Sequence, residues 1–203
     1  MQRRPPIRGL IFDLDGTLVD SGLDFELMRS EMGLKPGRPL LEALAELDPA
    51  RADECRLILS RHERDGALRA TLMPGVHAFL NTIAGLGLRQ AVLTRNSREA
   101  ALATLDRLGL DFDPIVARDD APAKPDPAAI WKICEVWGLP REQVAMIGDF
   151  YFDIEAGRRA GVRTVLYTGR RDPLAVEGWG KADFCLQCFA DAEALLAWLE
   201  QPD

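Results

Sequence analysis

Short apolar runs, several rich in β-branched residues, alternate with stretches of helical spacing along most of the chain. This alternation predicts a parallel sheet whose strands are joined by crossover helices. The expected strands are 7–12, 90–94, 115–117, 144–147, 164–167 and 184–186. Hydrophobic residues make up 47% of the 203 positions, which is enough for a sizeable core.

Helices are indicated where apolar residues recur at positions i, i+3, i+4 and i+7. Three such sets are Val76, Phe79, Leu80 and Ile83; Ile130, Ile133, Cys134 and Trp137; and Ala192, Leu195, Leu196 and Leu199. Gly109 and Gly138 follow helical segments and are expected to end them in the left-handed conformation. Asn96 and Glu99 predict a capping box that opens a helix at Ser97.

The first strand is not followed at once by its crossover helix. Residues 21–73 predict helices around 24–32, 39–47 and 50–69, and the β/α alternation resumes only after them. We therefore expect a core made of 1–20 and 74–203, with 21–73 as an inserted helical unit. Arginines recur along the third of these helices among acidic residues, and this pattern favours a solvated face that includes Glu63.

The formal net charge is −7, and this excess of acid argues against a nucleic-acid-binding surface. No apolar run is long enough for a membrane span, and no export signal is recognisable, so we expect a cytoplasmic protein. Reduced thiols are then expected at all four cysteines, which are Cys55, Cys134, Cys185 and Cys188. The lone Cys185-x-x-Cys188 pair lacks the further ligands of a zinc site and is interpreted as part of a strand.

The densest chemical signal is Asp13-Leu-Asp15-Gly-Thr, directly after the first strand. In open α/β sheets, ligands bind at the carboxyl ends of the strands. Two carboxylates this close repel one another, and a divalent cation would remove that conflict. One acid could then stay ionised as a nucleophile while the other holds a proton for a leaving group.

Three more groups follow strand ends in the same way. Asp149 comes after the strand 144–147, and Asp153 can face the same site if a helix begins between them. Oxygen-only ligands of this kind suit Mg²⁺. Thr94 offers a hydroxyl to a phosphate oxygen, and Lys124, between an alanine and a proline, offers a positive charge.

These four pieces, in this order, resemble the haloacid dehalogenase superfamily of phosphohydrolases, in its phosphoglycolate-phosphatase-like branch. The resemblance implies a Rossmann-like parallel α/β core with a small all-helical cap inserted after strand one. Asp13 would be the nucleophile and Asp15 the general acid/base, while Thr94 and Lys124 would hold the phosphoryl group. Mg²⁺ would be bound by Asp13, Asp149 and the backbone carbonyl of Asp15, with Asp153 steadying its water shell.

The chain departs from the family's pattern after Thr94. Members often carry Asn directly after this residue, whereas here Arg95 intervenes and Asn96 follows, so both are kept as candidate substrate-binding residues. The 150–152 loop is aromatic, and Phe150 and Phe152 could line the site or pack into the core. The inserted unit carries eight Lys or Arg and ten Asp or Glu, a net charge of −2. Such a lid gives no long-range attraction for a polyphosphate.

The resulting hypothesis is Mg²⁺-dependent hydrolysis of a small phosphomonoester, with phosphoglycolate or a sugar phosphate as candidates. A phosphomutase would use the same residues and remains an alternative. A dehalogenase would not need the acid Asp15. A non-catalytic binding protein on the same scaffold is expected to have lost Asp13, Asp15 or Lys124, and all three are present. The oligomeric state stays open.

Overall fold

A computed structural model describes residues 5–172 and 179–200 of the chain. Its centre is a six-stranded sheet in the order β5-β4-β1-β6-β7-β8, and every neighbouring pair is parallel. The strands are β1 (Gly9–Phe12), β4 (Arg89–Leu93), β5 (Ile115–Val116), β6 (Val144–Gly148), β7 (Arg163–Tyr167) and β8 (Phe184–Leu186). All six lie where the apolar runs predict them, so the expected parallel α/β fold is confirmed.

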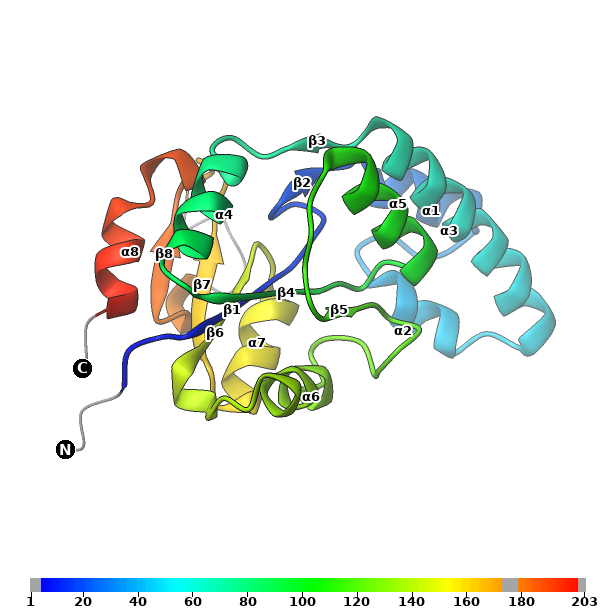
Figure 1. The fold of residues 1–203 in the computed structure, drawn as a ribbon. Helices are drawn as coiled ribbons and strands as arrows, with labels where there is room; N and C mark the ends of the chain where they lie inside the picture. Colours follow the sequence, from blue (N-terminus) through cyan, green and yellow to red (C-terminus); the bar gives the residue numbers. More distant parts are fainter. Residues whose placement is uncertain (1–4, 173–178, 201–203) are drawn as a thin grey trace.

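Helices cover both faces of this sheet (Figure 1). They are α4 (Val76–Gly85), α5 (Arg98–Leu108), α6 (Ala128–Trp137), α7 (Tyr151–Ala160) and α8 (Glu193–Glu200), with short 3-10 turns at Arg141–Gln143, Trp179–Lys181 and Phe189–Asp191. Side chains alternate between the faces along each strand. Leu10 and Phe12 accordingly pack in one cluster with α4, α5 and α8, while Ile11 packs with α6 and α7.

Helix ends follow local sequence signals, with one exception. Gly109 and Gly138 end α5 and α6 with φ of 64°, as predicted. The predicted capping box is wrong, because Ser97 and not Asn96 caps α5, through its side chain on the amide of Ala100. The side chain of Asn96 is used elsewhere, since its amide group donates to Asp15.

The inserted segment is helical, as expected, with α1 (Phe25–Glu31), α2 (Leu40–Ala45) and α3 (Pro49–Arg69). Asp24 and Asp48 cap α1 and α3, and a proline occupies the first turn of α3, where its missing N–H costs nothing. The three helices share an apolar cluster of their own, which consists of Met28, Met32, Leu40, Leu44, Cys55 and Leu59.

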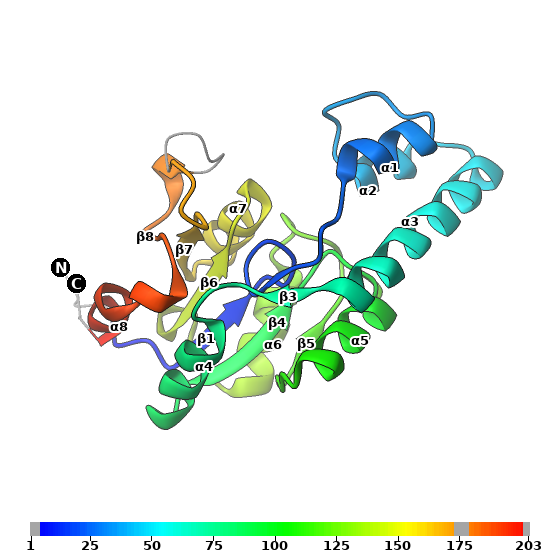
Figure 2. The ribbon, with the colours of Figure 1, turned by 90° about the horizontal axis from the view of Figure 1, so that it is seen from above.

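A short ribbon joins this segment to the sheet. It pairs β2 (Val19–Asp20) with β3 (Thr71–Leu72) in antiparallel fashion, and two residues per strand were too few for the sequence pattern to predict. From there α3 runs away from the sheet, and its end near the ribbon packs along α5 (Figure 2). In the description that follows, residues 21–73 are called the cap.

Ion pairs and hydrogen bonds tie the cap to the core. Glu63 on α3 is buried, contrary to the solvated face predicted for this helix, because both its oxygens accept from the guanidinium of Arg118. Arg107 on α5 donates to the carbonyls of Ala67 and Ala70 at the end of α3. The cap is therefore held at the carboxyl end of the sheet on the side of β4 and α5.

The thiols of Cys55, Cys134, Cys185 and Cys188 are free, as expected. Cys185 lies in β8, which agrees with the interpretation of its region as a strand. Within the two described ranges, no helix combines the length and apolar character needed to cross a bilayer.

Candidate active site

The polar residues singled out by sequence meet at the carboxyl edge of the sheet. Asp13, Thr94 and Asp149 directly follow β1, β4 and β6, which are neighbours in the sheet. The amide of Asp13 donates to the carbonyl of Ile147 at 2.8 Å and so continues the ladder between β1 and β6. Because parallel strands end at one edge, residues far apart in the chain are brought together there.

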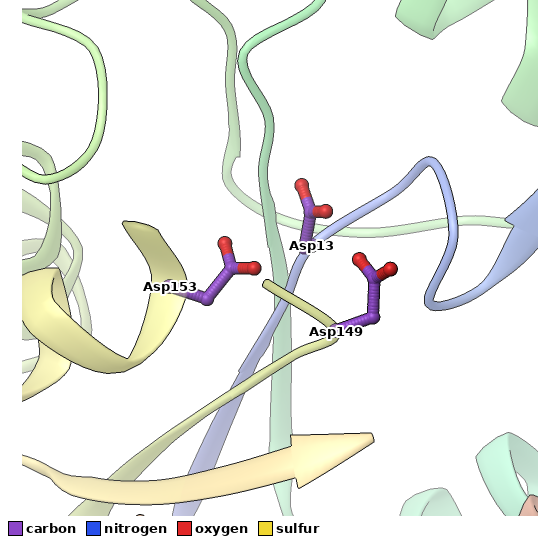
Figure 3. A group of neighbouring side chains, drawn as sticks. All are labelled: Asp13, Asp149 and Asp153. Atoms are coloured by element: carbon purple, nitrogen blue, oxygen red, sulfur yellow. The ribbon is translucent and has the colours of Figure 1, made fainter. Parts of the chain in front are cut away.

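Three carboxylates form a cluster at this edge (Figure 3). Asp13, Asp149 and Asp153 each offer an oxygen, and these oxygens all lie within 4.8 Å of one another. Asp153 joins the cluster from the first turn of α7, where its other oxygen accepts from the amide of Phe150. The donors are oxygens only, a set that fits a hard divalent cation.

Burial and mutual repulsion disfavour the ionised forms of these acids. Burial, together with the charges of Asp153 and Asp149, raises the pKa of Asp13 well above its usual value, although Lys124 opposes the rise. Burial and the neighbouring Asp153 raise the pKa of Asp149 to about 6. A divalent cation would favour the ionised carboxylates, which are the forms that can act as ligands.

Lys124 provides the positive charge at the centre of the cluster. Its ammonium lies 2.6 Å from an oxygen of Asp13 and 2.6 Å from an oxygen of Asp153, and it donates to the carbonyl of Leu93 at 2.7 Å. Its side chain is only 2% exposed. Burial alone would lower the pKa of Lys124, but the two carboxylates outweigh burial and raise it. The lysine is therefore a fixed, charged donor beside Asp13.

Asp15 is not part of this cluster and has a different environment. Its carboxyl oxygens accept from the hydroxyl of Ser21 at 2.5 Å and from the amide group of Asn96 at 3.0 Å. Burial raises the pKa of Asp15, although both hydrogen bonds oppose the rise. Neutral donors stabilise a carboxylate less than an ammonium does. A divalent cation at the cluster would lower the pKa of Asp13 and leave Asp15, whose hydrogen-bond donors are neutral, as the carboxyl suited to hold a proton.

Two glycines allow the close approach of these segments. Gly16 has a φ of +85°, and a Cβ there would lie 2.6 Å from a carboxylate oxygen of Asp149. At Gly148, a Cβ would overlap the side chain of Asp153. Both positions therefore need glycine for the carboxylates to converge.

The residues that follow β4 make contacts in two different places. Thr94 is buried, and its hydroxyl accepts from the backbone amide of Asn96 at 3.0 Å. The guanidinium of Arg95 turns toward the cap, where it pairs with Glu42 on α2. It also lies 4.0 Å above the ring of Phe152. Phe152 therefore packs under Arg95 at the rim of the site, whereas Phe150 is exposed.

Several neighbours of the site escaped the sequence analysis. Glu42 reaches it only because the cap folds over the edge of the sheet, whereas Ser21 lies only six residues after Asp15; no local pattern marks either residue. Arg171 pairs with Asp149 at 3.2 Å. It lies in the loop after β7, so the rule that ligands bind at carboxyl strand ends could have indicated it.

A cavity of about 310 Å³ opens beside Asp149, between the start of the cap and the loop after β7. Its lining includes Asp20, Tyr167, Arg170 and Arg171. A larger hollow of about 450 Å³ lies at the opposite end of β4, around His77 and Asp111, and holds none of the clustered residues. Of these two spaces, only the smaller one adjoins the carboxylate cluster.

A parallel α/β sheet with an acidic cluster and a buried lysine at its carboxyl edge defines a class of hydrolytic enzymes. Residues 7–161 match the family model described as haloacid dehalogenase-like hydrolase, and the chain belongs to this family. The resemblance inferred from the motifs is thus confirmed, and the chain is an enzyme.

Relatives of known name support a phosphatase within the family. A phosphoglycolate phosphatase of Rhodospirillum rubrum is 32% identical, over 96% of this chain and 92% of its own length. The pyrophosphatase PpaX of Halalkalibacterium halodurans is also 32% identical, over 79% and 83%. The crystal structure of a predicted phosphoglycolate phosphatase from Haemophilus somnus shares the fold, with a TM-score of 0.76, 23% identity and coverage of 94% and 98%.

Cation binding should depend on pH through Asp149. Its pKa is raised from 3.8 to about 6, so the cation-free fold loses stability as the pH rises through this interval. The ionised form is the ligand, and apparent Mg²⁺ affinity should therefore weaken by up to about tenfold per pH unit below about pH 6. Titration calorimetry measures the affinity, and the rise in melting temperature caused by Mg²⁺ should be larger at about pH 7.5 than at about pH 5.

Two variants provide controls for this experiment. Asp149→Asn should weaken Mg²⁺ binding at both pH values and leave only the pH dependence that Asp13 contributes, whereas Asp53→Asn, at an exposed position of α3, should leave affinity and pH dependence unchanged. Equal Mg²⁺ affinity of the unaltered protein at both pH values would contradict the assignment of the carboxylate cluster as a cation site.

Proposed function

We propose that this enzyme hydrolyses a small phosphomonoester, with Mg²⁺ as cofactor, through a phosphorylated Asp13. The observation that carries the proposal is the pairing of the buried Lys124 ammonium with Asp13 and Asp153, beside a second, separately held carboxyl on Asp15. This arrangement offers a nucleophile, an anion-binding cation and a proton donor within one site.

In the first step, a carboxylate oxygen of Asp13 attacks phosphorus in line with the ester oxygen. The bond from phosphorus to the ester oxygen breaks, and the departing alkoxide takes a proton from Asp15. In the second step, Asp15 accepts a proton from a water molecule, whose oxygen attacks the phosphorus of the aspartyl-phosphate. Inorganic phosphate leaves, and the Asp13 carboxylate is restored.

Lys124 and Thr94 are proposed to hold the phosphoryl oxygens during both steps. The ammonium of Lys124 lies 2.6 Å from Asp13, so its positive charge is already beside the group to which the phosphoryl group would be transferred. The hydroxyl of Thr94 accepts from the backbone amide of Asn96, and the side-chain amide of Asn96 donates to Asp15. Asn96 therefore contributes by positioning the acid.

Asp13, Asp149 and the backbone carbonyl of Asp15 would hold Mg²⁺, with Asp153 acting through its water shell. Mg²⁺ offsets the negative charge of the carboxylates and of the substrate phosphate, which would otherwise repel one another. Arg171, which pairs with one oxygen of Asp149, would help to orient that carboxylate.

The cap, residues 21–73, is proposed as the unit that selects the leaving group, and 1–20 with 74–203 as the unit that performs the chemistry. The cap contacts both Asp15, through Ser21, and Arg95, through Glu42. Its small size favours a short phosphorylated acid or sugar. A relative named phosphoglycolate phosphatase supports phosphoglycolate, which we propose as one candidate substrate.

Release of inorganic phosphate from a panel of phosphomonoesters tests this function. The unaltered protein should release phosphate with Mg²⁺ and not after exhaustive chelation. Asp13→Asn should abolish turnover because an amide cannot form the acyl phosphate, while Asp53→Asn should leave it unchanged. Fresh Asp13→Asn protein, checked for deamidation, must show no measurable turnover, or the covalent route is wrong. Conversion of a sugar phosphate into an isomer without free phosphate would indicate a phosphomutase instead.

The role of Asp15 is separable from that of Asp13. Asp15→Asn should slow phosphorylation by alkyl phosphates severely, by about 10²-fold or more, because an alkoxide leaves poorly without a proton. The loss should be much smaller for p-nitrophenyl phosphate, whose leaving group barely needs a proton. Single-turnover kinetics measures this step directly. Equal losses on the two substrates would remove Asp15 from the role of general acid.

A further inference from the structure

Arg95 is a partly buried cation whose guanidinium is held from two sides. One nitrogen of its guanidinium donates to the backbone carbonyl of Lys124, and its Cζ lies over the ring of Phe152, 4.0 Å from the ring centroid. Its side chain is 20% exposed. A planar guanidinium fixed by a carbonyl and an aromatic ring is oriented before any ligand arrives.

The remaining edge of this guanidinium faces a carboxylate of the cap. The second nitrogen, Nη2, lies 2.8 and 2.7 Å from the two oxygens of Glu42, on α2. Glu42 is 41% exposed and is the half of the pair that can move away. An ion pair this open contributes little to stability, so another carboxylate could replace Glu42 at small cost.

The position of Asp15 places the leaving group on this side of the site. A leaving oxygen must lie within hydrogen-bond reach of the acid that protonates it. The carboxyl of Asp15 is held by Ser21, at the start of the cap, and by Asn96, the residue next to Arg95. A leaving group that is protonated by Asp15 therefore extends toward the cap and the loop after β4, where Arg95 lies.

Other cations around the site are less suited to this role. Lys124 is bound by Asp13 and Asp153, and Arg118 is paired with Glu63, whose side chain is 4% exposed. Arg170 and Arg171 lie in the loop after β7, where they pair with Asp191 and Asp149. Of these five cations, only Arg95 combines a place next to Asn96, which holds Asp15, with a partly exposed carboxylate partner.

On the basis of the proposed function, we infer that Arg95 determines specificity by binding a carboxylate on the leaving group of the substrate. Glu42 occupies that place when no substrate is bound, and it competes with the substrate for the guanidinium. An anionic leaving group replaces Glu42 with the charge balance unchanged. A neutral leaving group has no such partner, and its binding leaves the Glu42 contact in place.

Two phosphate esters that differ only at the end remote from the phosphate test this inference. Phosphoglycolate carries a carboxylate where 2-hydroxyethyl phosphate carries a neutral hydroxymethyl group. Calorimetry on Asp13→Asn protein with Mg²⁺ gives the Kd of each ester without turnover. We expect preference for phosphoglycolate in this protein, and a fall in the preference by about tenfold or more when Arg95→Gln is added. Arg95→Lys, which keeps the charge and loses the planar fork, should give an intermediate preference.

The matched variant tests competition by Glu42. Glu42→Gln should tighten phosphoglycolate binding by about two- to fivefold and leave 2-hydroxyethyl phosphate nearly unaffected. Glu46→Gln is the control, because Glu46 flanks the same helix and pairs with Arg38 away from the site. The ratio of kcat/KM for the two esters in protein with Asp13 intact should follow the same pattern.

Equal weakening of both esters by Arg95→Gln would assign Arg95 a merely structural role and overturn the inference. Weaker phosphoglycolate binding in Glu42→Gln would show that Glu42 supports the substrate and does not compete with it. If the Kd values follow the expected pattern but protein with Asp13 intact releases no phosphate from either ester, the carboxylate site stands and the proposed function fails.

Discussion

The buried ammonium of Lys124 is the constraint on which the arrangement of this site depends. Three carboxylates converge within 4.8 Å at the carboxyl edge of the sheet, where partial burial weakens the screening of their repulsion by water. The ammonium, 2.6 Å from two of them, offsets part of that repulsion, and a divalent cation would offset more. The glycines at 16 and 148 then let the backbone bring these charges together without a clash.

The same charge distribution separates the tasks of Asp13 and Asp15. Burial raises the pKa of both, but Asp13 has an ammonium partner, while the hydrogen-bond donors to the Asp15 carboxyl are a hydroxyl and an amide. An ionised group beside Lys124 and a protonated group beside Asn96 are the two states that phosphoryl transfer through an aspartate requires. Because Ser21 lies at the start of the cap and Asn96 in the loop after β4, the acid also determines from which side the leaving group departs.

Most of the sheet could be predicted from sequence because its strands are buried apolar runs, and the four motifs follow them in order. The two-residue strands β2 and β3 could not be predicted, since so short a segment has no periodicity. The predicted capping box failed because Ser97 is itself a good cap, which leaves Asn96 free to hold Asp15. Glu42 belongs to the site only through the placement of the cap, and a contact between distant segments leaves no local signal. Burial of Glu63 was missed for the same reason, because its partner Arg118 lies 55 residues away.

The most direct test of the account is to trap the covalent intermediate. The enzyme is quenched during turnover of a phosphomonoester with Mg²⁺, and borohydride then reduces any acyl phosphate to the corresponding alcohol. Tryptic cleavage releases the peptide 9–29, in which tandem mass spectrometry distinguishes position 13 from position 15. The account predicts homoserine at position 13 and unaltered aspartate at position 15. Active enzyme that yields no homoserine, or homoserine at another position, would contradict it.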